Sequence, residues 1–187
     1  MSEKFNFKTI RVIFGLGNPG REYADTFHNA GSQLISFLKN DFIPGGKWKK
    51  HSSGIFTYAQ SDGKILVLPL VFMNESGIMV SRAISFFKEN PKRILVAHDD
   101  SDIRLGSYKI AKERGAAGHK GALSVMTHLG TRSFWRVRIG IGRLRNGKKE
   151  KAESFVLARE TPEETETLRK TFETIAEKEF FPAESEN

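Results

Sequence analysis

The sequence predicts a single α/β domain, built from a twisted mixed β-sheet with helices on both faces. Short runs of β-branched and apolar residues alternate with amphipathic segments, which is typical of α/β proteins. Two apolar runs flank a Ser-Asp-Gly turn at 61–63, which predicts a β-hairpin and hence a mixed sheet. The length of 187 residues suits one core, so we expect one domain over residues 1–187.

Apolar composition and periodicity predict six strands. The run at 8–14 ends in Val-Ile-Phe and is expected to be buried on both faces. The run at 135–141 alternates apolar residues with Arg or Gly, which is the period of a half-exposed strand. The expected strands cover 8–14, 54–60, 64–70, 93–97, 107–112 and 135–141.

Four helices are expected between and after these strands. Gly130 is a typical residue to end the third helix. Thr161 begins the last one, because Pro and two Glu follow it in the first turn. The expected helices cover 29–40, 77–89, 120–129 and an acidic C-terminal segment from about 161. Segments 41–50, 113–118 and 143–151 are expected to be loops.

Charge divides the chain into a basic body and an acidic end. From residue 160 onward there are nine acidic and three basic residues, out of totals of 22 and 30. The remaining 13 acidic and 27 basic residues give residues 1–159 a net charge of +14. A body of this charge favours a polyanionic partner, although basic charge can also serve solubility alone.

The composition also bounds location and chemistry. No apolar run approaches the roughly 18 residues of a membrane span, and the N-terminus lacks a signal-peptide core, so we expect no membrane contact. Cysteine is absent, which excludes disulfides, thiolate metal sites and a cysteine nucleophile. We therefore expect a cytoplasmic protein.

The segment after the first strand holds a glycine-rich motif. Gly15, Gly17 and Gly20 match the G-x-G-x-x-G pattern of dinucleotide-binding loops. Pro19 makes the turn rigid at the position where the helix of a dinucleotide-binding loop would begin, which counts against that interpretation. Asp41 lies at the spacing of the ribose-binding acid but follows a helix rather than a strand. Dinucleotide binding is therefore an alternative that the pattern supports only weakly.

His28 is the best candidate for proton transfer, since an unperturbed pKa of about 6.5 suits a general base. The expected loop at 98–102 supplies carboxylates at the same sheet edge, and one of these can fix the tautomer of the imidazole. The same acids can bind a divalent cation. Since no His-x-x-His or Glu-x-x-His accompanies them, we expect no metal.

Two further loops meet that edge. Asn74, in 72–77, offers an amide for hydrogen bonding, although a turn role explains it equally well. The Gly/Ala-rich segment 115–121 leads into a helix N-terminus and can bind an anion, or serve as a plain connection.

In order along the chain, these motifs resemble those of bacterial-type peptidyl-tRNA hydrolases. The family's GLGNPG-x-x-Y-x-x-T-R-H-N-x-G matches 15–31, and its F-M-N-x-S-G matches 72–77. Its strand followed by H-D-[ED]-x-D matches 97–102. Its G-G-H-N-G matches 117–121 in part, and its F-x-R-[LV]-R-I-G-I-G matches 134–142. The resemblance covers nearly the whole chain.

The resemblance implies hydrolysis of the ester that joins a peptide to the terminal ribose of tRNA, without metal or cofactor. It implies that His28 is the general base and that Asp99 holds and polarises it. It further implies that Asn18 hydrogen-bonds the peptide and helps reject unblocked aminoacyl-tRNA, and that Asn74 positions water or substrate.

The resemblance also implies a tRNA-binding surface and a monomer. Tyr23 and Phe72 are expected to line the site near the terminal nucleotide. His119 and Lys120 are expected to contact the substrate, and Arg138 to grip the 5′ phosphate.

Three positions depart from the family pattern. Phe27 stands where the family has Arg beside the base, and Lys120 replaces an Asn. Ala111 aligns with a phosphate-gripping lysine, although Lys112 is adjacent. Phe27 and Lys120 keep open an alternative in which the protein binds RNA without hydrolysing it.

Overall fold

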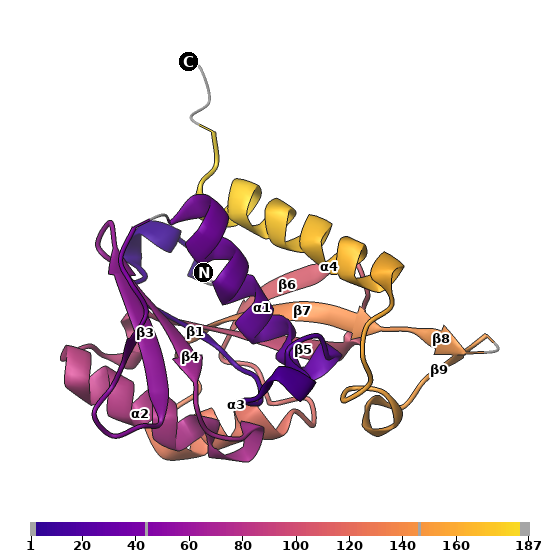
Figure 1. The fold of residues 1–187 in the computed structure, drawn as a ribbon, viewed down its shortest axis with the longest axis horizontal. Coiled ribbons are helices and arrows are strands. Elements are labelled where there is room, and N and C mark those ends of the chain that lie inside the picture. Colours follow the sequence, from indigo (N-terminus) through magenta and orange to yellow (C-terminus); the bar gives the residue numbers. More distant parts are fainter. Residues whose placement is uncertain (1–2, 44, 146, 184–187) are drawn as a thin grey trace.

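A seven-stranded β-sheet forms the centre of the computed structural model, which describes residues 3–43, 45–145 and 147–183 (Figure 1). The strand order is β2-β3-β4-β1-β5-β7-β6. The four adjacent strands β4, β1, β5 and β7 are parallel to one another. Strands β2, β3 and β6 pair antiparallel with their neighbours, so the predicted mixed sheet is confirmed. The strands are β1 (Val12–Gly15), β2 (Lys49–Lys50), β3 (Phe56–Ser61), β4 (Lys64–Pro69), β5 (Ile94–Arg104), β6 (Tyr108–Lys112) and β7 (Trp135–Gly142).

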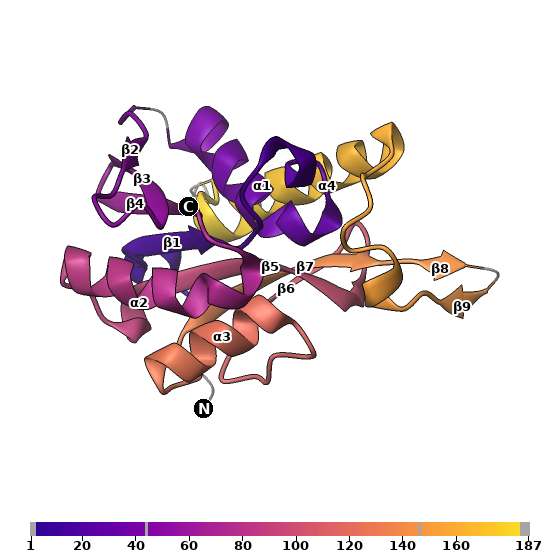
Figure 2. The ribbon, with the colours of Figure 1, turned by 60° about the horizontal axis from the view of Figure 1, so that its bottom comes forward.

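Four α-helices of the described chain pack on this sheet, two on each face (Figure 2). They are α1 (Ala30–Phe37), α2 (Ser76–Phe87), α3 (Lys120–Leu129) and α4 (Pro162–Ile175). Among the described residues, none of these helices combines the length and apolar composition that crossing a bilayer requires. Helices α1 and α4 cover one face, and α2 and α3 cover the other, which confirms the predicted fold class.

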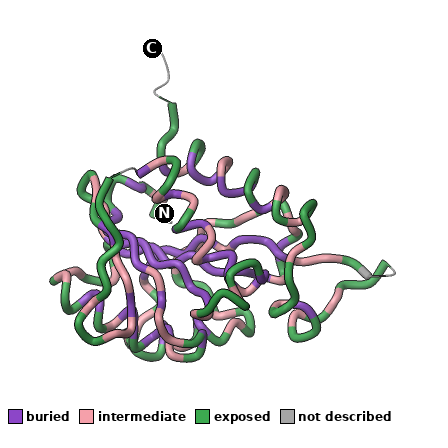
Figure 3. Tube along the Cα trace, in the orientation of Figure 1, coloured by how far each residue is buried: buried purple, intermediate pink, exposed green. Residues whose placement is uncertain are grey.

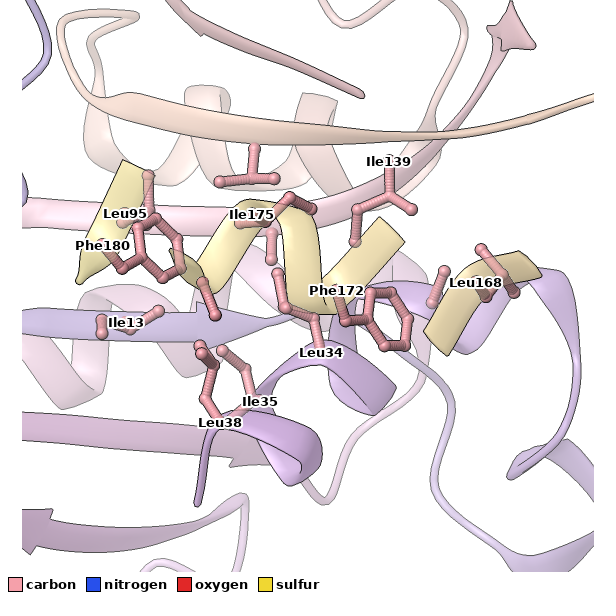
Figure 4. Packing of buried hydrophobic residues seen from close by; sticks show 14 of the residues in the cluster. Ile13, Leu34, Ile35, Leu38, Leu95, Ile139, Leu168, Phe172, Ile175 and Phe180 are labelled. Atoms are coloured by element: carbon pink, nitrogen blue, oxygen red, sulfur yellow. The ribbon is translucent and has the colours of Figure 1, made fainter. Parts of the chain in front are cut away.

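Alternating side chains of the strands fill a core on each face. Ile13 belongs to the same buried cluster as Leu34 of α1 and Phe172 of α4 (Figure 4). Its neighbours Val12 and Phe14 belong to the cluster on the α2 and α3 side. Most residues of the central strands are buried and are coloured purple in Figure 3. Fully burying each such apolar side chain contributes about 1.5–3 kcal/mol.

The acidic helix α4 begins as predicted. The Thr161 hydroxyl accepts from the backbone N–H of Glu164, and the Glu164 carboxylate accepts from the backbone N–H of Thr161, which makes a capping box. Leu168 and Phe172 of α4 are buried against the sheet. The acidic helix is therefore part of the core and does not stand clear of the body.

Two strand predictions are wrong in detail. The acidic residues 98–102 were expected to form a loop, but β5 continues through them because β7 pairs alongside, with His98 opposite Arg138. Strand β7 was expected to be half-exposed. It is almost wholly buried, with Arg136 only 1% exposed, because β5 and β6 flank it and helices cover the sheet.

Smaller differences concern the ends of elements. Residues Phe7–Thr9 form a 3-10 turn capped by Asn6, so β1 starts four residues later than the predicted strand at 8–14. The predicted loop 41–50 contains β2. The predicted loop 143–151 contains a small hairpin, β8 (Leu144–Arg145) and β9 (Lys148–Lys149). The predicted hairpin turn is confirmed, with positive φ at Asp62 and Gly63.

Close packing of α1 on β5 depends on Gly31. A Cβ at this position would lie 2.2 Å from the carbonyl oxygen of Ala97, which is backbone and has little room to move. We expect Gly31→Ala to lower the free energy of unfolding by at least ~1–3 kcal/mol, measured by urea denaturation. Gly115→Ala is the matched control, because a Cβ there would meet no atom within 4 Å. Equal stability of the two variants would contradict this assignment.

Candidate active site

A pocket of about 950 Å³ opens where the parallel strands β1, β4 and β5 end. This edge is the usual ligand-binding position of α/β sheets. Segments that follow β1 and β4, the end of β5, the start of α3 and the segment 149–157 all contribute to its walls. The pocket brings together seven of the nine predicted site residues, which are Asn18, His28, Phe72, Asn74, Asp99, His119 and Lys120.

The other two predicted site residues lie outside the pocket wall. Tyr23 contacts the pocket residue Phe72 edge-on, with ring centroids 6.2 Å apart. Arg138 donates from Nε to Oδ2 of Asp100 at 2.6 Å, and Asp100 itself lines the pocket. Both side chains are therefore one contact away from the cavity.

His28 lies in a 3-10 turn, Phe27–Asn29, that leads into α1. Its backbone N–H donates to the carbonyl oxygen of Val156 at 2.8 Å. Its side-chain Nδ1 lies 3.0 Å from Oδ1 of Asp99. Because a carboxylate only accepts, Nδ1 carries a proton, so in the neutral imidazole the lone pair is on Nε2. This is the tautomer that a general base requires.

His119 makes a second hydrogen bond to the same carboxylate oxygen. Its Nε2 lies 2.8 Å from Oδ1 of Asp99, and its Nδ1 caps α3 by accepting from the backbone N–H of Ala122 at 3.1 Å. An amide N–H only donates, so the proton of His119 is on Nε2 and points to Asp99. Sequence reasoning placed His119 at the substrate and missed this contact.

Asp99 stays ionised in this environment. Burial by itself raises the pKa of the Asp99 carboxyl. Electrostatic attraction to His119 and the hydrogen bonds from His119 and His28 outweigh burial and hold that pKa well below its ordinary value. His28 and His119 thus both donate a hydrogen bond to the ionised carboxylate of Asp99.

The same three side chains are spaced closely enough to hold a metal ion. Ligand atoms of His28, Asp99 and His119 lie within 4.8 Å of one another. However, a metal on Nε2 of His119 would require the proton to move to Nδ1, where it would face the donor N–H of Ala122. The cap of α3 therefore favours hydrogen bonding over metal ligation at this cluster.

Asn18 is held by the neighbouring polar groups. Asn29 accepts from the backbone N–H of Asn18 at 2.8 Å and donates to its carbonyl oxygen at 3.0 Å. The side-chain Oδ1 of Asn18 accepts from the backbone N–H of Met73 at 2.9 Å. Within the described residues, the Nδ2 group of Asn18 has no hydrogen-bond partner and can donate to a ligand.

The departure at Phe27 does not alter the pocket. Phe27 is 0% exposed and packs against Phe155, with ring centroids 5.6 Å apart. The guanidinium of Arg143 lies over both rings, 5.1 Å and 4.3 Å from their centroids. The side chain before the candidate base therefore belongs to the core.

Sequence reasoning missed the segment 149–157, which begins at the last residue of β9. It lines the pocket with Lys149, Val156 and Leu157 among others, and it anchors the backbone of His28. No motif distinguishes this segment, because its contribution depends on where the chain returns in space.

Comparisons with known proteins relate nearly the whole chain to one family. The sequence model of the peptidyl-tRNA hydrolase family matches residues 12–181. The peptidyl-tRNA hydrolase of Akkermansia muciniphila is 42% identical over 159 residues, which cover 85% of this chain and 82% of that protein. That of Marinobacter nauticus is 39% identical over 168 residues, which cover 89% and 85%.

The fold matches as well. The crystal structure of peptidyl-tRNA hydrolase from Acinetobacter baumannii aligns with a TM-score of 0.79 and 32% identity, covering 91% of this chain and 86% of that one. These matches confirm the predicted fold and favour hydrolysis over RNA binding alone. The chain therefore belongs to the peptidyl-tRNA hydrolase family.

Proposed function

We propose that this protein hydrolyses the ester between peptide and terminal ribose in peptidyl-tRNA, with His28 as general base. The observation that carries this proposal is the 3.0 Å hydrogen bond from Nδ1 of His28 to Asp99 at the wall of the pocket. Membership in the family supplies the substrate class.

The geometry supports a simple sequence of steps. Nε2 of His28 accepts a proton from water while the water oxygen attacks the ester carbonyl carbon. The tetrahedral intermediate then collapses, the bond to the ribose oxygen breaks, and the imidazolium returns its proton to that oxygen. Asp99 keeps Nδ1 protonated and stabilises the imidazolium through its negative charge.

Two amides and a basic surface complete the proposed substrate contacts. Asn18 donates from Nδ2 to the peptide, and Asn74 positions water or substrate from the opposite loop. Lys120 is exposed at the pocket, where its charge can hold a phosphate. Arg138 binds the 5′ phosphate, and Tyr23 and Phe72 stack near the terminal nucleotide. The +14 charge of residues 1–159 supports a tRNA ligand.

Cleavage of N-acetylated aminoacyl-tRNA tests this function. We expect the protein to release the acetylated amino acid and to leave unblocked aminoacyl-tRNA largely intact. Tight, salt-sensitive tRNA binding without cleavage would instead establish the RNA-binding alternative. We propose a cytoplasmic monomer, for which light scattering should give about the chain mass of 21.1 kDa.

Restoring the family residue at position 120 tests the main departure in the pocket. We expect Lys120→Asn to raise kcat, because Lys accepts no hydrogen bond and cannot orient water as Asn does. It should also lower the slope of log KM against log salt by about 0.7–0.9, the effect of one lost phosphate contact. Steady-state kinetics at several salt concentrations measure both. Lys88→Asn is the control, because Lys88 is exposed at the C-cap of α2, has a positive φ of 56° that suits Asn, and lies outside the pocket wall. An unchanged kcat in Lys120→Asn would contradict the prediction.

A further inference from the structure

A buried histidine–arginine pair adjoins the pocket, and the proposed mechanism uses neither residue. His98 on β5 is 0% exposed, and Arg136 on the neighbouring strand β7 is 1% exposed. Burying a guanidinium is unfavourable, and apolar residues of similar volume often replace buried charges without loss of stability. Packing alone therefore does not explain why a histidine and an arginine occupy these two buried positions.

His98 contacts the two groups that determine the position of Asp99. Its Nδ1–H donates to the backbone carbonyl oxygen of Asp99 at 2.7 Å. Its ring packs edge-on against that of His119, with centroids 4.6 Å apart. Because His119 donates to the Asp99 carboxylate, His98 supports both the backbone and a hydrogen-bond donor of Asp99.

Arg136 holds His98 and the loop that carries His119. Its Nη2 donates to the carbonyl oxygen of Arg114 at 2.9 Å, in the loop that precedes His119. Its Nη1 lies 3.5 Å from Nε2 of His98. Because a guanidinium only donates, Nε2 of His98 is the acceptor and Nδ1 carries the proton. This is the tautomer that the bond to the carbonyl of Asp99 requires.

Neither residue changes protonation near neutral pH. Burial, with a smaller effect from Arg138, lowers the pKa of Arg136 to about 10, so the guanidinium stays charged. Burial, and then the charges of His119 and Arg136, lower the pKa of His98 well below its ordinary value, so the imidazole stays neutral. The pair is thus suited to a fixed support and not to proton transfer.

We propose that His98 and Arg136 are positioning residues, which hold His119 and Asp99 in the geometry that orients His28. The role in hydrolysis rests on the function proposed above. The contacts form a continuous chain from Arg136 through His98 and His119 to the carboxylate.

Substitutions on β7 test this role. Arg136→Met removes the donors and the charge but keeps the length, and Arg136→Lys keeps the charge. Arg138→Met makes the same change two residues along the strand, where the side chain contacts Asp100 instead. Each variant is characterised by kcat and KM on N-acetylated aminoacyl-tRNA, by imidazole ¹⁵N NMR of the free protein, and by thermal unfolding.

We expect Arg136→Met to lower kcat by about 10–100-fold, by analogy with the loss of a hydrogen bond that orients a metal-binding side chain, with little change in KM. The NMR signal of the Nε2–H tautomer of His119 should change, and Arg136→Lys should restore part of kcat. Arg138→Met should raise KM and leave the His119 signal as in the parent.

A folded Arg136→Met variant with parental kcat, or with an unchanged His119 signal, would overturn the proposal. A loss of kcat that only follows the fraction unfolded would do the same. Should Arg136→Met not fold, His98→Gln is measured in its place, with the same changes in kcat and in the His119 signal expected. The NMR measurement needs no substrate. A changed His119 signal in a protein that cleaves no ester would therefore refute the proposed function while supporting the positioning of His119.

Discussion

Replacement of His28 by alanine is expected to lower kcat for N-acetylated aminoacyl-tRNA by roughly 10²–10⁴-fold, which is the usual contribution of a general base. The variant loses the nitrogen that accepts the proton of water, while the pocket that binds the substrate stays in place. KM is therefore expected to change little. Single-turnover cleavage with enzyme in excess measures the chemical step apart from binding and release.

His128→Ala is the matched control for this substitution. His128 is exposed in the last turn of α3 and does not line the pocket. We expect its kcat to equal that of the parent. If His28→Ala and His128→Ala cleaved the ester at the same rate, His28 would not be the base.

Replacement of Asp99 by asparagine is expected to lower kcat by roughly 10³–10⁴-fold, by analogy with other carboxylate–histidine pairs. The change keeps the shape of the side chain but removes the negative charge that stabilises the imidazolium of His28. It also allows an amide N–H to face Nδ1, which favours the tautomer with the proton on the wrong nitrogen. Steady-state kinetics measure the effect.

Asp62→Asn is the matched control, because Asp62 is exposed in the β3–β4 turn, where its positive φ of 48° suits Asn. It should retain parental kcat. Parental kcat in Asp99→Asn would show that the carboxylate charge plays no part in the reaction.

The depressed pKa of Asp99 also predicts how stability depends on pH. A carboxyl whose pKa is lower in the folded chain contributes stability that is complete above its unfolded pKa of about 3.9. That contribution is lost as the pH falls toward the folded pKa. The difference in free energy of unfolding between the parent and Asp99→Asn should therefore be largest above about pH 4 and shrink in acid. Urea denaturation across pH tests this, and a pH-independent difference would contradict it.

Local signals predicted most of the fold. The capping residues around Thr161, the Ser-Asp-Gly turn and the helical spacing before Gly130 each depend on neighbours in sequence, and each prediction is confirmed. The predicted end of the strand at 93–97 was wrong, because the polar residues that follow it are typical of a loop. The strand continues past Ala97 because His98, Asp99 and Asp100 pair with β7, a contact distant in sequence.

The sequence predicted which residues form the candidate site, but not all of the contacts that they make with one another. Motif order placed His28, Asp99 and Asn18 at one sheet edge, and the pocket contains all three. The bond from His119 to Asp99 was missed, because it depends on the tautomer that the cap of α3 imposes. The buried state of Phe27 was missed for a similar reason, since Phe155, which covers it, is distant in sequence.

The central claim is that His28 and Asp99 act as one unit, and a double-mutant cycle tests it most directly. Single-turnover rates of ester cleavage are measured for the parent, His28→Ala, Asp99→Asn and the double variant. If Asp99 acts only through His28, the double variant should cleave as slowly as His28→Ala and no slower. Rate losses that multiply in the double variant would contradict the proposed pairing.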